Sequence, residues 1–271
     1  MEMITSASNE QVKKIRALNA RAKIRREEGL FVAEGTRLFR EIPPKLREHV
    51  YVSESFYKEH ADILSGICYD VLEENLFHRV CDTRTPQGIL TLVKIPEWSR
   101  EDLLGTGENA PLILVLEDLQ DPGNVGTMIR TSEAAGVTGV IVSAGTADLY
   151  QPKVIRSTMG SIFRVPVCRE EDPAETVRWL KEKKIRVFGA HLKGSRNYVD
   201  QDYTEGTAFC IGNEGNGLSE KLTGMLDCRI KIPMDGQVES LNAAVSAAVL
   251  LYTAHAQRTA EFPGNRGKRK G

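Results

Sequence analysis

The second half of the chain carries its longest continuous apolar runs. Residues 112–116 read LILVL and residues 139–142 read GVIV. Continuous runs of this kind are typical of strands that are covered on both faces. Segments with helical spacing separate them, and this alternation predicts a parallel sheet with helices on both faces. Strands are expected at 112–116, 139–142, 164–167, 186–190, 208–211 and 229–232, and helices at 127–135, 152–159, 174–183, 219–225 and 241–252.

The helix expected at 241–252 differs from the others in its pattern. Ala, Val and Leu occupy nearly every side of it, so no polar face is left for solvent. A helix that is apolar all round is buried in its own domain or packs against a second subunit.

The first half of the chain predicts a smaller α/β unit. Ser8 and Gln11 have the spacing of a capping box, and Val12, Ile15 and Leu18 follow at helical spacing. Further helical segments lie between short apolar runs. Strands are expected at 30–32, 50–52, 66–71 and 88–93.

Periodicity disappears between the two halves, which sets the expected domain boundaries. The stretch 97–110 contains GTGEN and is linker-like in composition. We therefore expect an N-terminal domain at 1–96, a linker at 97–110, a C-terminal domain at 111–260 and a basic tail at 261–271.

Composition narrows the class of protein. The 271 residues are 41% hydrophobic and 27% charged, as in an ordinary soluble globular protein. No apolar run is long enough to span a membrane, and no secretory signal is visible. The five cysteines form no C-x-x-C pair, so they are expected to be buried, reduced thiols of a cytoplasmic protein, and no metal site is expected.

Charge is distributed unevenly along the chain although the net charge is only −1. Between Gln11 and Arg26 there are seven basic residues and no acidic residue. Clustered Lys and Arg are the footprint of a phosphate backbone, and a merely solvated helix face is the alternative. The predicted RNA-binding residues are Lys13, Lys14, Arg16, Arg21, Lys23, Arg25 and Arg26.

Polar loops follow several of the expected C-terminal strands. Residues 211–218 read IGNEGNGL, and a loop of three glycines and one carboxylate suits the close approach of a ligand to the backbone. The G-x-G-x-x-G spacing of dinucleotide sites is absent, and so are a P-loop lysine and a Ser–His–Asp pattern. A plain strand-to-helix turn is the alternative.

Three segments together resemble the motifs of the SpoU/TrmH family of RNA ribose methyltransferases, within the SPOUT superfamily. They are 121–131 (DPGNVGTMIRT), 211–218 and 232–242 (IPMDGQVESLN), and they match in order, separation and residue type. Segments 156–160 (RSTMG), 31–35 (FVAEG) and 85–88 (TPQG) extend the resemblance over nearly the whole chain.

The resemblance implies the fold, the cofactor and the partners. The implied fold is α/β: a C-terminal SPOUT domain with a parallel sheet and a trefoil knot, beside a small N-terminal substrate-binding domain. The implied cofactor is S-adenosyl-L-methionine, the implied substrate is RNA, and the implied assembly is a homodimer without metal or membrane.

The resemblance also implies roles for individual residues. Arg130 would stabilise the ribose oxygen as its negative charge develops, because an arginine keeps its proton and makes a poor base. Asn124 and Asn242 would position Arg130 and the ribose. Glu214 would hold the arginine or fix the glycine loop, and Ser240 would cap the last helix and touch the substrate. The implied cofactor-binding residues are Gly212, Ile232, Leu241, Ile211 and Gly217.

Other functions stay open at this point. The separate N-terminal domain favours ribosomal RNA over transfer RNA by analogy. An RNA-binding or assembly factor that has lost activity is an alternative, as is an enzyme that methylates a base.

Overall fold

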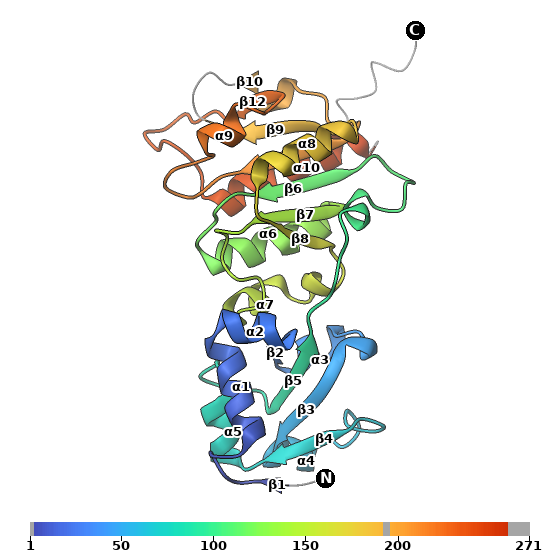
Figure 1. Ribbon diagram of the computed structural model, residues 1–271, viewed down its shortest axis with the longest axis vertical. Coiled ribbons are helices and arrows are strands. Elements are labelled where there is room, and N and C mark those ends of the chain that lie inside the picture. Colours follow the sequence, from blue (N-terminus) through green and yellow to red (C-terminus); the bar gives the residue numbers. More distant parts are fainter. Residues whose placement is uncertain (1–2, 192–195, 260–271) are drawn as a thin grey trace. The chain divides into compact units, whose positions relative to one another are not determined.

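The structure is a computed structural model that describes residues 3–191 and 196–259. The chain divides into two compact units, which we describe separately (Figure 1). The first unit contains residues up to Glu97 together with Asp148–Phe163. The second contains Trp98–Ala147 and the chain from Arg164 onward. The expected basic tail at 261–271 lies outside the described residues.

The first unit is built on a mixed sheet. Within the described residues its strand order is β1 (Met3–Ile4), β4 (Tyr69–Leu72), β3 (Arg47–Ser53), β5 (Ile89–Lys94) and β2 (Leu30–Glu34). The first three strands are parallel, and β5 runs antiparallel to both β3 and β2. The remaining elements are α1 (Glu10–Ala20), α2 (Ala22–Glu28), α3 (Thr36–Glu41), η1 (Pro44–Leu46), α4 (Glu54–Glu59), α5 (Glu74–Val80), α7 (Pro152–Thr158) and η3 (Ser161–Phe163).

The first helix begins one residue later than the capping-box pattern predicts. Asn9 is the N-cap, and its Oδ1 accepts a hydrogen bond of 2.8 Å from the Gln11 N–H. The Ser8 hydroxyl pairs with Ser6 instead. The expected apolar stripe is confirmed, because Val12, Ile15 and Leu18 are fully buried against residues such as Phe77.

The segment 148–163 packs with the first unit although it lies between two strands of the second. Its aromatic side chains surround Phe31 of β2, with ring centroids 5.1 Å away for Tyr150 and 6.2 Å for Phe163. Asp148 receives hydrogen bonds from the Arg25 guanidinium. The chain therefore contributes to the first unit twice.

The second unit contains the predicted parallel sheet. Within the described residues, all its strand pairs are parallel, in the order β10 (Arg196–Asn197), β12 (Cys228–Lys231), β9 (Arg186–Ala190), β11 (Thr207–Ile211), β6 (Leu112–Leu116), β7 (Gly139–Ser143) and β8 (Val167–Glu170). Its helical elements are η2 (Glu101–Leu104), α6 (Pro122–Ala134), α8 (Pro173–Glu182), η4 (Tyr198–Asp200), α9 (Glu220–Thr223) and α10 (Ala243–Arg258).

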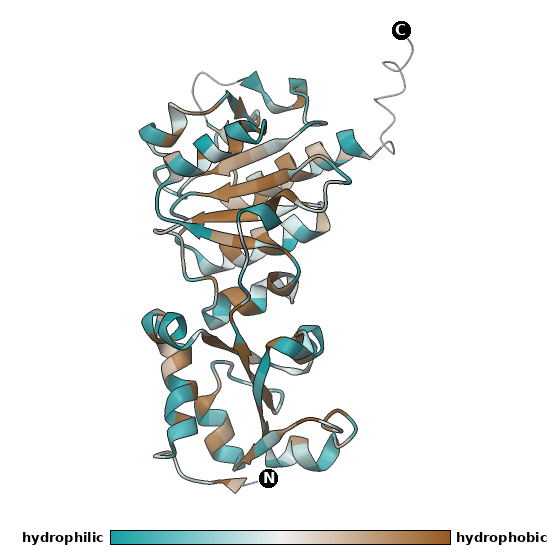
Figure 2. Ribbon diagram, turned by 45° about the vertical axis from the view of Figure 1, so that its right-hand side comes forward, coloured by the Kyte–Doolittle hydropathy of each residue, from teal (hydrophilic) through white to brown (hydrophobic). Residues whose placement is uncertain are grey.

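Helices cover both faces of this sheet, as predicted. Figure 1 shows α8 and α9 in front of the strands and α6 and α10 behind them, and α10 packs against α6 and β11. Figure 2 shows the strands in the hydrophobic colours and much of the helical surface in teal. Leu103, within the stretch expected to be a linker, is fully buried in the core beneath α8.

Several elements of the second unit differ from the prediction; α10, for example, ends at Arg258 and not at Tyr252. Strand β8 lies three residues beyond the expected range of 164–167. Helix α6 begins at Pro122 rather than at Thr127, because Asp121 caps it with a hydrogen bond of 2.8 Å from the Asn124 N–H. Proline suits the first position of a helix, where its missing N–H costs nothing. The first motif is therefore largely helical.

The cysteines depart from the prediction that all five are buried. Cys168 and Cys210 are buried, Cys81 and Cys228 are partly exposed, and Cys68 is exposed. None of the helices in the described part of the chain is long and apolar enough to cross a membrane.

Candidate active site

A glycine loop follows β11 at the carboxyl end of the parallel sheet. The N–H and C=O groups of Asn213 and Gly217 bond to each other at 3.0 and 2.9 Å, which closes the loop. A Cβ atom on Gly212 would lie 2.1 Å from the carbonyl carbon of Gly217, so only glycine fits there. Gly217 has φ +70°, a conformation that glycine adopts without strain.

The Asn213 side chain fixes the shape of this loop from inside. Its Oδ1 accepts from the N–H groups of Gly215 and Asn216 at 2.9 and 3.1 Å. Its Nδ2 donates to the Asp118 carbonyl at 2.8 Å, just after β6. One end of this side chain therefore holds the loop together, and the other ties the loop to the segment after β6.

Glu117 joins the two ends of the loop to β6. The Glu117 N–H donates to the Ile211 carbonyl at 2.9 Å, before the loop. Its carboxylate, only 5% exposed, accepts from the N–H and the hydroxyl of Ser219 at 2.7 Å each, after the loop. A buried carboxylate with two short donors holds this geometry firmly. Sequence reasoning missed Glu117; its position at the end of an apolar strand was the available signal.

Glu214, at the tip of the loop, reaches the start of α6. Its carboxylate accepts from the N–H groups of Gln120 and Asp121 at 3.1 and 3.2 Å and from Asn124 Nδ2 at 3.1 Å. Partial burial alone would raise the pKa of Glu214. The hydrogen bonds from Asn124, Gln120 and Asp121 outweigh it and hold the pKa below its usual value. The carboxylate therefore stays ionised and fixes the loop, which was one of its two expected roles.

Two asparagines continue this network to the last helix. Asn242 Nδ2 donates to Asn124 Oδ1 at 3.1 Å, across 118 residues of sequence. Asn242 also caps α10, since its Oδ1 accepts from the N–H groups of Ala244 and Val245. The expectation that Ser240 caps this helix is therefore wrong; Ser240 is exposed and lies two residues earlier.

A cavity of about 650 Å³ opens beside the glycine loop. Its walls come from the loop, from the ends of β9 and β12, and from the segment that leads into α10. The predicted residues that line it are Gly212, Ile232, Leu241, Ile211, Gly217, Glu214, Ser240 and Asn242.

The cavity wall also includes side chains that the motifs did not indicate. Sequence reasoning missed His191, which follows β9, and Lys231, which ends β12. It also missed Met234 and Glu239, which lie inside the third motif. For His191 and Lys231, the position at a strand end was the signal that could have found them.

Asn124 and Arg130 do not line this cavity. Asn124 still reaches it through its hydrogen bonds to Glu214 and Asn242. Arg130 lies six residues farther along α6 and is exposed, and its side chain makes no hydrogen bond or ion pair within the described residues. One chain therefore brings together the predicted cofactor and loop residues but leaves the predicted catalytic arginine outside.

The predicted RNA-binding cluster lies on α1 and α2, and one member requires correction. Arg25 is only 4% exposed and donates to Asp148 and to the carbonyls of Leu18 and Asn19, so it is a structural residue. Within the described residues, Arg16, Arg21 and Arg26 are exposed and have no ionic or hydrogen-bond partner. The remaining lysines pair with acidic residues: Lys13 with Glu10, Lys14 with Glu28 and Lys23 with Glu27.

Comparison with known families divides the chain into two matched regions. Residues 111–252 match the SpoU rRNA Methylase family, and residues 9–91 match the MRM3-like substrate binding domain. These regions contain the cavity and the basic helices, respectively.

Individual relatives extend the similarity over most of the chain. The 23S rRNA (guanosine(2553)-2'-O)-methyltransferase RlmP of Bacillus subtilis is 37% identical over 257 residues, which cover 93% of this chain and 98% of that protein. The 23S rRNA (uridine(2479)-2'-O)-methyltransferase of Streptomyces viridochromogenes is 38% identical over 64% of this chain and 61% of its own length.

Solved structures show the same similarity in three dimensions. The SpoU methyltransferase AviRb from Streptomyces viridochromogenes, in complex with the cofactor AdoMet, has a TM-score of 0.83 and 27% identity, covering 92% of this chain and 98% of its own. The AdoMet-bound rRNA methyltransferase from Sinorhizobium meliloti has a TM-score of 0.81 and 28% identity, covering 93% and 97%.

Proposed function

This chain belongs to the SpoU rRNA methylase family, and from that premise we propose that it methylates a ribose 2′-hydroxyl of ribosomal RNA with S-adenosyl-L-methionine. The observation that carries the proposal is the cavity beside the glycine loop, whose walls contain all the residues expected to bind the cofactor. The relatives named above act on ribosomal RNA, which favours that substrate over transfer RNA.

The residues around the cavity fit this cofactor. Ile211, Gly212 and Ile232 line the cavity wall, and main-chain N–H and C=O groups of such residues would pair well with the edge of an adenine. The close approach of Gly212 to Gly217 leaves no room for a side chain there. When bound, S-adenosyl-L-methionine supplies an electrophilic methyl group on a positively charged sulfur.

In this proposal, Arg130 provides the positive charge that stabilises the reacting ribose oxygen. A hydroxyl oxygen becomes negative as it loses its proton, and a fixed cation stabilises that charge. Because arginine keeps its proton, we assign it electrostatic stabilisation of the ribose oxygen or of an adjacent phosphate, and not the removal of the proton. Asn124 and Asn242 hold the start of α6 against the start of α10, and so set the position of the helix that carries Arg130.

A homodimer would bring Arg130 to a cavity. Helix α10 exposes an apolar stripe, with Val245 and Tyr252 each 48% exposed and Val249 partly exposed between them. These positions share one face of the helix. We propose that two copies pack through this stripe and that each Arg130 serves the cavity of the other copy. Light scattering should give twice the chain mass, whereas an active monomer at assay concentration would exclude this arrangement.

The proposal also covers the threading of the chain and the compartment in which the reaction takes place. We propose that the segment before α10 is threaded as a trefoil knot, supported by the contact of Asn242 with Asn124. We place the reaction in the cytoplasm, in keeping with the bacterial rRNA-modifying relatives.

Two measurements separate this function from an inactive RNA-binding factor. Calorimetry should detect binding of S-adenosyl-L-methionine to the purified protein. Isotopic methyl transfer should label ribosomal RNA and leave transfer RNA unlabelled. A protein that binds ribosomal RNA but neither binds nor uses the cofactor would be the inactive factor. The presence of Asn124, Arg130, Glu214 and Asn242 argues against that outcome.

A further inference from the structure

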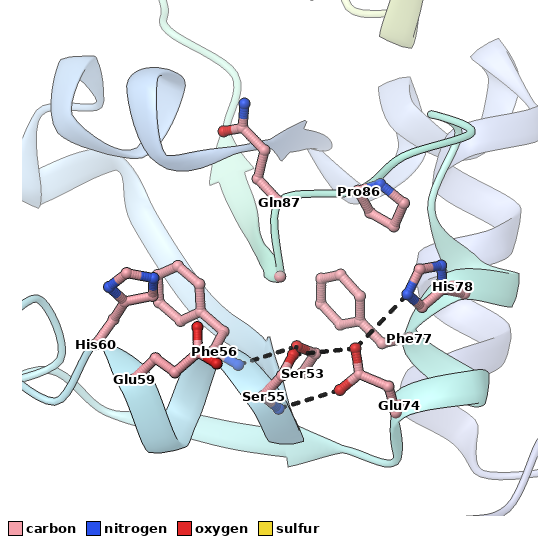
Figure 3. Close-up of a pocket in the computed structure, with 11 residues that line it drawn as sticks. Ser53, Ser55, Phe56, Glu59, His60, Glu74, Phe77, His78, Pro86 and Gln87 are labelled. Atoms are coloured by element: carbon pink, nitrogen blue, oxygen red, sulfur yellow. Dashed lines mark hydrogen bonds and ion pairs between the residues drawn. The ribbon is translucent and has the colours of Figure 1, made fainter.

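A second pocket lies in the first unit, and it is lined by none of the residues assigned to methyl transfer. Its volume is about 220 Å³, and it lies among α4, α5 and the turn that enters β5. In Figure 3, Phe56, Glu59 and His60 lie on one side of the space, Phe77 and Glu74 lie on the other, and Pro86 lies above. No role of the methyl-transfer site explains these residues.

The two N-terminal segments that resemble the family meet at this pocket. The Gly35 N–H donates to the Ile89 carbonyl at 3.0 Å. Gln87 Oε1 accepts from the N–H and the hydroxyl of Thr36 at 3.0 and 3.1 Å. These bonds fix the turn that holds Pro86 at the pocket wall. Segment 85–88 therefore lines the pocket through Pro86, Gln87 and Gly88, and segment 31–35 supports it from outside the pocket.

Two carboxylates line the pocket, those of Glu59 and Glu74, and Glu74 Oε1 lies 3.6 Å from His78 Nε2. The Glu74 carboxylate accepts from the N–H and the hydroxyl of Ser55, both at 3.1 Å. Partial burial would raise the pKa of Glu74, but the bonds from Ser55 and Ser53 outweigh it and lower the pKa. Glu59 is exposed and has no hydrogen bond or ion pair within the described residues.

These charges define which ligands the pocket accepts. Among the described residues that line it, none is Lys or Arg, so a phosphate group would meet two carboxylates, with only the imidazoles of His60 and His78 beside them. A neutral ligand that donates hydrogen bonds fits instead. Pro86 and the partly exposed His60 offer flat surfaces, and the His60 ring lies 4.5 Å from the Phe56 ring between centroids. A flat ligand with amino donors matches both properties.

The pocket is structurally coupled to the basic helices. Helix α5, which carries Glu74, packs against α1, where Asn19 Nδ2 donates to the Val80 carbonyl at 2.9 Å. Helix α1 carries the exposed residues Lys13 and Arg16. Sequence-specific RNA binding combines cations for the phosphates with sites for unstacked bases.

We propose that this pocket binds one unpaired RNA base that carries an amino group: adenine, guanine or cytosine. Glu59 and Glu74 would accept from the amino group, and His60 and Pro86 would contact the face of the base. Uracil is disfavoured, because its carbonyl oxygens would face the carboxylates. The proposal rests on RNA being the substrate, and it adds a base-selective contact remote in the chain from the methyl-transfer motifs.

The test measures binding of the full chain to short single-stranded oligo(A), oligo(C) and oligo(U) by fluorescence anisotropy at one salt concentration. The test variant combines Glu59→Gln with Glu74→Gln. The matched control is Glu54→Gln, which removes a carboxylate charge from α4 at a residue that does not line the pocket. Because removing any carboxylate favours RNA binding in general, the informative quantity is the ratio of affinities between the oligonucleotides.

The wild-type protein should bind oligo(A) and oligo(C) roughly fivefold or more tightly than oligo(U), a difference on the scale of one base contact. The double variant should bring this ratio close to one, and Glu54→Gln should leave it unchanged. If the double variant does not fold, Glu59→Gln alone should still lower the ratio. A wild-type ratio near one, or a ratio that the pocket variants leave unchanged, would overturn the proposal.

Two additional measurements complete the test. The first distinguishes an RNA base from a protein side chain as the ligand, and the second distinguishes a failure of this proposal from a failure of the proposed function. If an arginine-rich peptide loses binding in the double variant while the base preference persists, the pocket holds a cationic protein side chain and the proposal fails. Calorimetry with S-adenosyl-L-methionine on the same samples separates this proposal from the proposed function. A protein that shows the base preference without cofactor binding would overturn the function and leave the pocket assignment standing.

Discussion

The glycine-loop region of the second unit and the basic helices of the first unit differ in how far their polar side chains are paired within the protein. Around the glycine loop, polar groups are paired with one another: Glu214 accepts three hydrogen bonds, and both ends of Asn213 are used. The side chains of Arg16 on α1, Arg21 between the two helices and Arg26 on α2 have no hydrogen-bond or ionic partner within the described residues. The polar groups around the glycine loop are therefore held in place before a ligand binds, whereas the three arginines are available to contact one.

This difference follows from the chemistry expected of each region. Methyl transfer requires groups held to within a fraction of an ångström, and hydrogen-bonded supports provide that precision. Phosphate contacts act mainly through charge and counterion release, so they tolerate mobile side chains. Removing a group that hydrogen bonds hold in place should therefore cause a large loss of activity or cofactor affinity. Removing an unpaired cation should cause a small, salt-dependent loss of RNA affinity.

Two arginines are exceptions to this difference in pairing, and each of them provides a test of it. Arg25 lies in the basic run but is buried and fully paired, whereas Arg130 lies in the second unit but is exposed and unpaired within the described residues. The first should behave as a structural residue, and the second should depend on a group outside its own chain.

Arg25→Ala should cause the largest loss in folding stability. It leaves Asp148 without its cation and two buried carbonyls without donors, and breaking a buried pair costs about 3 kcal/mol or more. Thermal or urea unfolding measures this loss. The neighbouring Arg26→Ala, at an exposed site, should change stability by less than about 0.5 kcal/mol. Equal effects of the two substitutions would mean that Arg25 is not a structural residue.

Arg130→Ala should lower the rate of methyl transfer by roughly a hundredfold or more, the scale seen when one charge-stabilising donor is removed. Cofactor affinity should change little, because the cofactor would be held by the loops at Gly212 and Ile232, which line the cavity. Arg130→Lys should restore little activity, since an ammonium lacks the planar fork of a guanidinium. Single-turnover assays beside calorimetry provide both readouts. A near-normal rate in Arg130→Ala would remove the arginine from the mechanism.

Glu117→Gln should weaken cofactor binding by roughly tenfold. The amide can accept only one of the two hydrogen bonds from Ser219, so the end of the glycine loop loses a charged support. Calorimetry measures the affinity, and the neighbouring Glu220→Gln serves as an exposed control. An unchanged affinity in Glu117→Gln would show that the loop keeps its shape without this carboxylate.

Replacing Arg16, Arg21 and Arg26 by Ala should weaken RNA binding, with the smallest effect per residue of the substitutions proposed here. RNA affinity should fall, and the slope of its dependence on salt should become shallower by about one unit for each phosphate that the protein no longer neutralises. Cofactor affinity should stay constant. The matched set Lys13, Lys14 and Lys23 pairs with glutamates and should contribute less. Equal losses from the two sets would show that pairing does not reduce RNA binding.

The sequence predicted those features that depend on local pattern. The parallel strands at 112–116 and 186–190 lie where their apolar runs predicted. The end of α6 was also found, but its start was missed because the DPGNVG segment resembles a loop until Asp121 is known to cap it. Local signals of this kind are ambiguous for short polar segments that contain glycine and proline.

The features that the sequence could not predict depend on contacts between distant residues. Arg25 resembles its basic neighbours in sequence, and only the packing of the segment 148–163 makes it a buried partner of Asp148. The bond between Asn242 and Asn124 likewise joins two motifs that are 118 residues apart. The resemblance to a family indicated which residues matter, but not which atoms meet.

The most direct test of ribose methylation is to locate the methyl group on the RNA. Purified protein, S-adenosyl-L-methionine and unmodified ribosomal RNA are incubated, and the product is partially hydrolysed with alkali. A 2′-O-methyl group removes the nucleophile that cleaves the neighbouring linkage, so we expect one resistant linkage at the labelled nucleotide. Incorporation of the methyl group with every linkage still cleaved would place it on a base and contradict ribose methylation.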